Sequence, residues 1–218
     1  MNTIIAEVKE LTREKFAEIA SAIERLEITD STIDIKYGTY CISHRPNIAP
    51  KAFAIWIFPG IDEITISQYE KTNKVTIPDV YRDFLYTMNG ATIFKLDLFG
   101  IPLSMVNEPP TVDRSTVTPK DISIANKRSL SEKSNKENSS FVFGGGPWTL
   151  EERVRYFLNE KEQVFSFKSN GEQVGQWSSF KQFLKEEIVR VEKEYSKYEK
   201  YMSNLLSKHR SGNFESKQ

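Results

Sequence analysis

Hydrophobic residues recur at helical spacing over the first part of the chain, and Glu and Lys fill the opposite side of the pattern. No Gly or Pro interrupts residues 4–27, so the pattern predicts one amphipathic helix across this segment. The apolar stripe consists of Val8, Leu11, Ile19, Ile23 and Leu26, with Phe16 close to it.

The polarity pattern then changes to that of strands. Alternation of apolar and polar residues over 33–37 predicts one strand, and residues 40–42 predict a second one after Gly38. Residues 53–58 are apolar on both faces and are closed by a Pro-Gly pair, which predicts a buried strand. A short helix is predicted over residues 63–73.

The most specific local pattern runs from Ile77 to Gly90. Pro78 suits the first turn of a helix, because its missing N–H is not needed there. Asn89-Gly90 is predicted to end this helix, with Gly90 in the left-handed conformation. The predicted buried face, at spacing i, i+3, i+4 and i+7, consists of Tyr81, Phe84, Leu85 and Met88.

The second half of the chain alternates between strand patterns and polar segments. Strands are predicted at 94–99 and 141–143, and a turn or bulge is predicted at Gly144–Pro147. The polar segments are 104–120 and 131–140, both predicted as loops, and 121–129, predicted as a short helix or turn.

A β-hairpin is predicted at Asn170-Gly171, because a two-residue Asn-Gly loop accepts the positive φ values of a tight turn. The apolar runs on either side are 164–167 and 174–177. The predicted cross-strand pairs are Phe167 with Val174 and Val164 with Trp177.

A long helix is predicted from Ser179 onward, where Ser179 and Gln182 match a capping box. Its heptad stripe either packs on the chain's own N-terminal helix or sheet, or pairs with another chain. Packing within a monomer is favoured, because Tyr195 and Tyr198 suit the interface of a two-stranded coiled coil less well than Ile or Leu would. A homodimer formed through this helix is the alternative. The stripe consists of Leu184, Ile188, Val191, Tyr195, Tyr198, Met202 and Leu205.

Charge and composition exclude several classes of protein. Of the 218 residues, 30 are basic and 30 are acidic, so no global basic surface for nucleic acid is expected. A single cysteine cannot form an intrachain disulfide, and two histidines leave few ligands for metals or His-based catalysis. No apolar run is long enough to span a membrane, and the N-terminus does not resemble a signal peptide. A cytoplasmic location is therefore expected.

Patterns that carry chemistry in other proteins are weak here. Cys41-x-x-His44 has the spacing of two metal ligands but lacks a second pair. The glycines at 144–146 lack the spacing and the Lys-Ser/Thr ending of a phosphate loop, and acidic residues interrupt the basic cluster near 127–128. Asp97, in an apolar strand, is expected to face solvent or to contact a partner. We expect no metal, no cofactor and no catalytic site.

A set of motifs along the chain keeps the order seen in a known family. The motifs are 66–70, Ile77-Pro78-x-x-Tyr81-x-x-Phe84-Leu85 with Asn89-Gly90, 96–101, 141–144 and 164–184. In these motifs the chain resembles the SUKH superfamily, also called the Smi/Knr-type domain, over about residues 61–185. The resemblance implies an α+β fold with an antiparallel-rich sheet and helices packed on it, flanked here by N- and C-terminal helices.

The resemblance also divides the chain into three parts. Residues 1–60 are an N-terminal helix and strand extension, residues 61–185 are the SUKH-like core, and residues 186–218 are a C-terminal amphipathic helix with a polar tail.

The function that the resemblance implies is that of a non-catalytic immunity protein. Such a protein binds and occludes a cognate secreted toxin domain of a polymorphic toxin system; the alternative is a regulatory protein-interaction scaffold without a toxin. No interface residue follows from the family. By position and residue type alone, Trp148, Arg153 and Arg155 are the candidate partner-binding residues.

Overall fold

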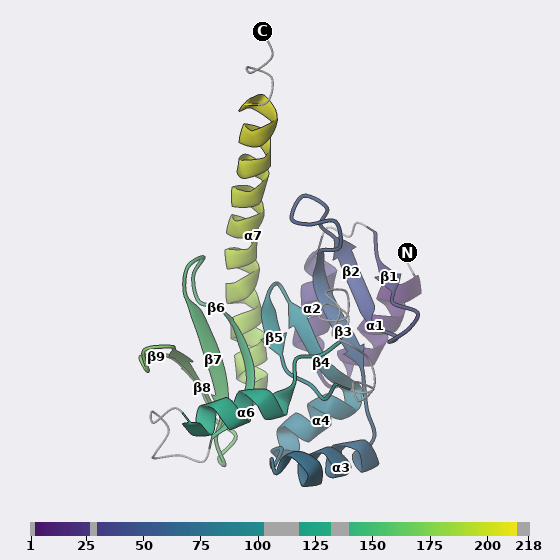
Figure 1. Ribbon diagram of the computed structural model, residues 1–218. Coiled ribbons are helices and arrows are strands. Elements are labelled where there is room, and N and C mark those ends of the chain that lie inside the picture. Colours follow the sequence, from purple (N-terminus) through teal and green to yellow (C-terminus); the bar gives the residue numbers. More distant parts are fainter. Residues whose placement is uncertain (1–2, 27–29, 103–117, 132–139, 213–218) are drawn as a thin grey trace.

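The computed structural model describes residues 3–26, 30–102, 118–131 and 140–212. They form one antiparallel sheet with helices packed on it, the α+β fold that the sequence predicts (Figure 1). The helices are α1 (Thr3–Arg13), α2 (Ala17–Arg25), α3 (Glu63–Asn73), α4 (Asp79–Thr87), α6 (Ile122–Ser131) and α7 (Phe180–Gly212). The strands are β1 (Thr32–Ile33), β2 (Tyr40–His44), β3 (Phe53–Pro59), β4 (Met88–Ile93), β5 (Leu96–Leu98), β6 (Phe141–Pro147), β7 (Arg153–Leu158), β8 (Val164–Lys168) and β9 (Gln173–Trp177).

Along the described chain, the nine strands lie in the sheet in the same order as in the sequence. Every neighbouring pair is antiparallel. Helices α3 and α4 connect β3 to β4, and α6 lies between β5 and β6 in the chain. Among the described helices, none combines the length and the apolar character that a membrane span requires.

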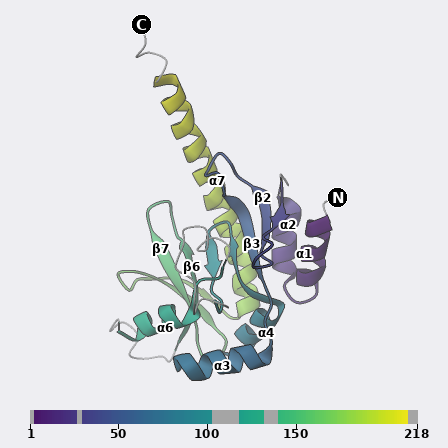
Figure 2. The same ribbon diagram turned by 45° about the vertical axis from the view of Figure 1, so that its right-hand side comes forward.

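The sheet has two chemically different faces, because side chains alternate along each strand. The inner face lies against α7 and is further covered by α1, α2 and α4 (Figure 2). Its row of cross-strand partners is Ile33, Tyr40, Ile57, Ala91, Leu98, Gly144, Tyr156, Ser166 and Gly175. The outer face points away from α7, and its row is Thr32, Cys41, Trp56, Thr92, Asp97, Gly145, Arg155, Phe167 and Gln173.

An aromatic cluster holds the helices on the inner face. Tyr81, Phe84, Leu85 and Met88, predicted as one buried helical face, are each 0% exposed, so their burial is confirmed. The first three lie on α4, whereas Met88 is the first residue of β4. Phe84 packs edge-on against Phe16 and Phe180, with ring centroids 5.3 and 5.7 Å apart. The Tyr81 hydroxyl donates to the carbonyl of Phe143 at 3.0 Å, and complete burial holds its pKa well above the usual range.

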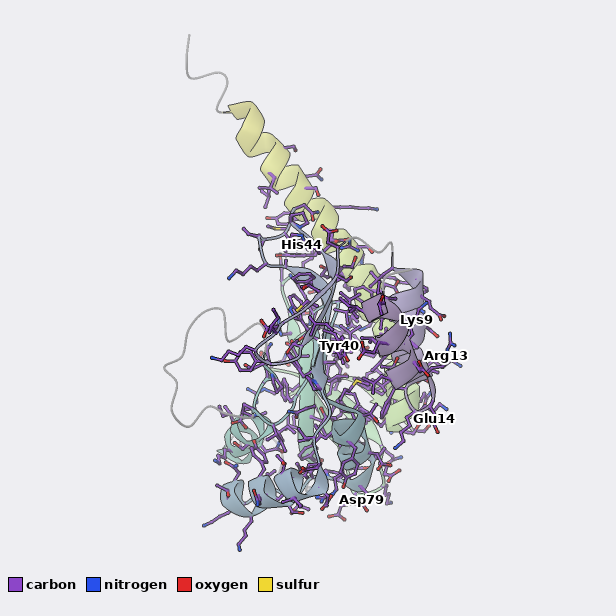
Figure 3. The ribbon with its side chains drawn as sticks, turned by 90° about the vertical axis from the view of Figure 1, so that its right-hand side faces the viewer. Lys9, Arg13, Glu14, Tyr40, His44 and Asp79 are labelled. Carbon is purple, nitrogen blue, oxygen red and sulfur yellow. The ribbon has the colours of Figure 1, made fainter. Side chains whose placement is uncertain are left out.

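The single helix predicted over 4–27 is wrong, because the chain breaks into α1 and α2 at Phe16. Phe16 leaves the helical conformation, with φ −132° and ψ 56°, and its ring is only 7% exposed. Breaking the helix places this ring against Phe84 in the core. The α1–α2 pair lies beside β2, where the Tyr40 hydroxyl donates to Glu7 at 2.8 Å; Figure 3 shows Tyr40 near α1, which carries Lys9 and Arg13.

The strand predicted over 33–37 is a turn after Ile33. The Asp34 carboxylate accepts hydrogen bonds from the backbone N–H groups of Lys36 and Tyr37, at 3.1 and 2.9 Å. These hydrogen bonds to the Asp34 side chain give the backbone an alternative to the inter-strand hydrogen bonds of a β-sheet. Ile35, between them in the turn, is fully exposed. The strands predicted at 40–42 and 53–58 are confirmed as β2 and β3.

Asn89-Gly90 does not end a helix but continues into strand β4. Gly90 has φ +89°, and a side chain there would collide with the carbonyl of Leu98. The Asn89 amide is buried and bonds both backbone polar groups of Ile101 at 2.7 Å. The strand predicted over 94–99 begins only at Leu96. Residues 94 and 95 instead form the tight turn between β4 and β5, with φ of 50° and 71°.

The glycines predicted to form a turn or bulge lie inside strand β6, next to a bulge between Val142 and Gly144. Strand β7 has no counterpart among the predicted elements.

The hairpin between β8 and β9 is present, and Val164 pairs with Trp177 as predicted. Its loop is longer than two residues, and a second bulge moves the partner of Phe167 from Val174 to Gln173. The helix or turn predicted at 121–129 is α6, whereas most of 104–120 and 131–140 lies outside the described residues.

Helix α7 begins where the sequence predicts. The N–H of Gln182 donates to Ser179 Oγ at 3.2 Å, and the Gln182 side chain accepts from the N–H of Ser178. Packing against the N-terminal helices is present, with an Arg25–Glu192 ion pair of 2.6 Å between α2 and α7. The last turns of α7 project beyond the sheet (Figure 1 and Figure 2), and the monomeric state stays a prediction.

Candidate partner-binding site

A hollow of about 380 Å³ opens on the outer face of the sheet, across strands β5 to β8. It is lined by Asp97, Phe99, Lys120, Gly145, Arg153, Val154, Arg155, Phe157, Phe167, Lys168, Ser169 and Gly171. Its volume falls in the range of sites that hold small ligands or a short peptide segment. The hollow therefore marks the outer face as a candidate binding surface.

The hollow exists because a glycine interrupts the outer row. Gly145 stands between Asp97 on β5 and Arg155 on β7, and it contributes no side chain to the space between them. A Cβ atom at this position would lie 3.1 Å from the carbonyl oxygen of Val154 and 3.7 Å from the Phe99 ring. The glycine thus keeps the floor of the hollow open.

Asp97 is a buried anchor for two cations rather than a solvent-facing residue. It is 6% exposed, and its carboxylate accepts a hydrogen bond from Thr92 Oγ1 at 3.0 Å. The same carboxylate forms ion pairs with Lys120 and, at 3.3 Å, with Arg153. The expectation that Asp97 faces solvent is wrong for this reason; contact with a partner stays a prediction.

The cations that Asp97 holds remain accessible from solvent. The side chains of Lys120 and Arg153 are 55% and 62% exposed. Because one carboxylate is shared between them, both keep donor groups that a ligand can reach. Lys168 is different: it is 17% exposed and is paired with Glu152 at 3.1 Å and Glu172 at 3.2 Å.

Aromatic rings form the apolar part of the hollow. Phe157 and Phe167 meet edge to face, with ring centroids 5.4 Å apart. Phe167 is also the cross-strand partner of Arg155, so a half-buried guanidinium and a half-buried ring stand side by side. An apolar floor beside cationic groups suits an anionic ligand that also carries an apolar group.

A buried network on the inner face supports the same strands from behind. Glu187 of α7 is 1% exposed and accepts from Tyr156 and from Arg190, the latter at 2.9 Å. Arg190 also donates to the carbonyls of Pro147 and Trp148, at 2.7 and 2.8 Å, and its guanidinium lies 4.4 Å from the centre of the Trp148 ring. Burial and the Glu187 charge hold the pKa of Tyr156 well above its usual range.

A family model described as the SMI1 / KNR4 family (SUKH-1) matches residues 60–186, more than half of the chain. The chain belongs to this family. No curated protein and no solved structure matches it.

In this SUKH-1 protein the whole hollow lies within the matched segment, whereas β1, β2 and β3 precede it and extend the same sheet. Of the three candidate partner-binding residues, the structure brings two together: Arg153 and Arg155 both line the hollow from β7. Trp148 lies apart from them, because its ring packs against Arg190 of α7 on the inner side.

Sequence reasoning missed most of the hollow of this SUKH-1 protein. Apart from Phe157, which is on β7 itself, its other charged and aromatic lining residues come from three further segments, and only the fold brings them to β7. One signal was present in the sequence: in Arg153-Val154-Arg155-Tyr156 charged residues alternate with apolar ones, which is the pattern of a half-buried strand, although Phe157 and Leu158 do not continue it. That pattern places Arg153 and Arg155 on one face.

The Cys41–His44 pair does not form a site in this SUKH-1 protein. Burial raises the pKa of the Cys41 thiol to about 11, and its Sγ lies 3.7 Å from the carbonyl of Thr39. The His44 ring instead contacts the Pro50 carbonyl at 2.9 Å. Within the described residues, no three His, Cys, Asp or Glu side chains gather as metal ligands would.

Proposed function

We propose that this protein is a non-catalytic immunity protein that binds a cognate secreted toxin domain and occludes it in the cytoplasm of the cell that makes both. The observation that carries this proposal is membership of the SUKH-1 family over residues 60–186. Members of the family are commonly immunity proteins and are generally not enzymes.

The hollow on the outer face supports a role in binding. It joins accessible cations to an apolar floor on a rigid sheet, and tight interfaces commonly centre on Arg and aromatic anchors. We assign direct contact with the toxin to Arg153 and Arg155. Trp148 acts indirectly in this proposal, by holding the β6–β7 connection against Arg190.

The test is co-expression with the C-terminal domain of a toxin encoded beside this gene. Growth is expected to survive when this protein is present and to fail with an empty vector, and the two chains are expected to co-purify. If cells die at the same rate with and without the protein, the immunity function is wrong. Co-purification without rescue would instead favour a regulatory scaffold.

A further inference from the structure

We propose that the hollow binds an acidic segment of the toxin domain, in which an Asp or Glu side chain stands next to an aromatic or aliphatic one. The inference rests on the proposed function and adds the chemistry of the partner. It is carried by the placement of charges and rings in the hollow, on strands whose positions the sheet fixes.

Positive charge exceeds negative charge among the side chains that line the hollow. Lys120, Arg153, Arg155 and Lys168 are cationic and Asp97 is the one carboxylate in the lining, but Lys168 is already neutralised by its ion pairs with Glu152 and Glu172. That carboxylate is buried and already engaged by Thr92, Lys120 and Arg153. A second carboxylate arriving from solvent would find donors on the two exposed cations. An Arg guanidinium binds a carboxylate through two parallel hydrogen bonds, which gives both strength and orientation.

The apolar part of the hollow sets the second requirement. The Phe157–Phe167 pair and the Phe99 ring border the space above Gly145. A purely charged ligand would leave the half-buried rings of Phe99 and Phe167 in contact with water, whereas Phe157 is already buried. A side chain with an apolar body would cover them and gain burial in addition to the ion pair. A neighbouring acidic and apolar residue on one extended segment meets both requirements.

A polypeptide fits the hollow better than a nucleic acid. The chain carries no net positive charge, and electrostatic attraction by many cations is what nucleic-acid binding requires. We therefore treat nucleic-acid binding as an outcome that would overturn the inference.

The first experiment measures the affinity of the toxin domain for three forms of the full chain. Arg155→Glu reverses a charge in the hollow, and Lys181→Glu makes the same change at an exposed position on α7. We expect Arg155→Glu to weaken binding at least about tenfold and Lys181→Glu to leave the dissociation constant within about twofold. Both variants should unfold at wild-type temperatures. Equal affinities for all three forms, with the toxin still bound, would overturn the inference and leave the proposed function intact.

The second experiment does not depend on the toxin. The peptide Ac-Glu-Phe-Glu-Phe-Glu-NH2, its Lys-for-Glu counterpart and a uridine hexanucleotide are titrated separately while backbone amide signals are followed by NMR. We expect the acidic peptide alone to shift signals on β5, β7 and β8, and Arg155→Glu to abolish those shifts. If the toxin does not bind but this result is obtained, the proposed function fails and the acidic preference stands. If the toxin complex forms, the effect of Arg155→Glu on its affinity decides whether the inference holds. If no complex forms, the peptide titrations decide. The inference is then overturned when the basic peptide or the RNA shifts the NMR signals as much as the acidic peptide or more, or when no signal in the hollow shifts.

Discussion

The two faces of the sheet place opposite chemistry on consecutive residues of one strand. On β7, Tyr156 points to the inner face and is 0% exposed, and it reaches the buried carboxylate of Glu187. Arg155, one residue earlier, points to the outer face and is half-buried at the hollow. The inner face is filled by rings from α4 and α7, whereas the outer face carries a gap above Gly145.

Under the proposed function, the residues that stabilise the fold are therefore separate from the residues that contact the partner. Buried apolar contacts on the inner face contribute most of the stability, and a change there leaves a cavity. Exposed charges contribute little to stability but strongly affect which partner is recognised. If the outer face binds the toxin as proposed, residues there can change, and with them the partner, while the inner face keeps the fold.

The largest effect is expected on the inner face at Phe84. The Phe84→Ala variant should lower the free energy of unfolding by about 3–5 kcal/mol, because the ring is completely buried among other rings. Chemical denaturation followed by circular dichroism measures the loss. Phe167→Ala on the outer face is the control and should cost clearly less, since Phe167 is only half-buried. Similar losses for the two variants would contradict the division between the faces.

A smaller effect is expected when one Arg–carboxylate pair is broken on each face. Arg190→Ala leaves Glu187 without its cation at 1% exposure and should cost about 3 kcal/mol. Arg153→Ala removes an exposed partner of Asp97, which keeps Lys120 and Thr92, and should cost at most about 1 kcal/mol. Thermal and denaturant unfolding of both variants test this order, and a larger loss for Arg153→Ala would refute it.

Sequence patterns correctly predicted the helices and strands whose structure is determined by residues close together in the sequence. The apolar face of α4, the buried strand β3 and the Ser179 cap of α7 agree with the sequence, because spacing and capping act over a few residues.

The errors arose where distant contacts override the local pattern. Phe16 breaks a continuous helical stripe because its ring has a place beside Phe84. Asn89 continues a strand because its amide bonds the backbone of Ile101, twelve residues away. A local periodicity carries no information about either partner, so neither outcome follows from spacing alone.

The sequence predicted no hollow; it named only two of the lining residues, Arg153 and Arg155, as candidates for partner binding. The charge pattern of the hollow depends on Lys120 meeting Asp97 and on Gly145 standing between Asp97 and Arg155, which are matters of strand order and register. The strand order follows the sequence, but the bulge in β6 shifts the register, and no residue pattern marks it before the fold is known.

The smallest effect is expected at Lys95, which stands in the β4–β5 turn between the two faces. Its Nζ lies 2.9 Å from the centre of the Tyr198 ring on α7, on the inner side, and Arg153 acts on it from the outer side. Burial, with a contribution from the charge of Arg153, lowers the pKa of Lys95 from 10.5 to about 8. Between these two values the unfolded chain binds more protons than the folded one, so this group makes stability rise with pH across that window.

Lys95→Gln should remove this contribution, so wild type should gain stability relative to the variant between about pH 8 and about pH 10.5. Arg153→Gln should raise the pKa of Lys95 and move the gain to higher pH, because a like charge has been removed. Denaturant unfolding at a series of pH values measures both differences. If stability changes with pH in the same way for wild type and Lys95→Gln, burial does not lower the pKa of Lys95. If Arg153→Gln follows the same stability curve as wild type, the charge of Arg153 on the outer face does not affect the pKa of Lys95.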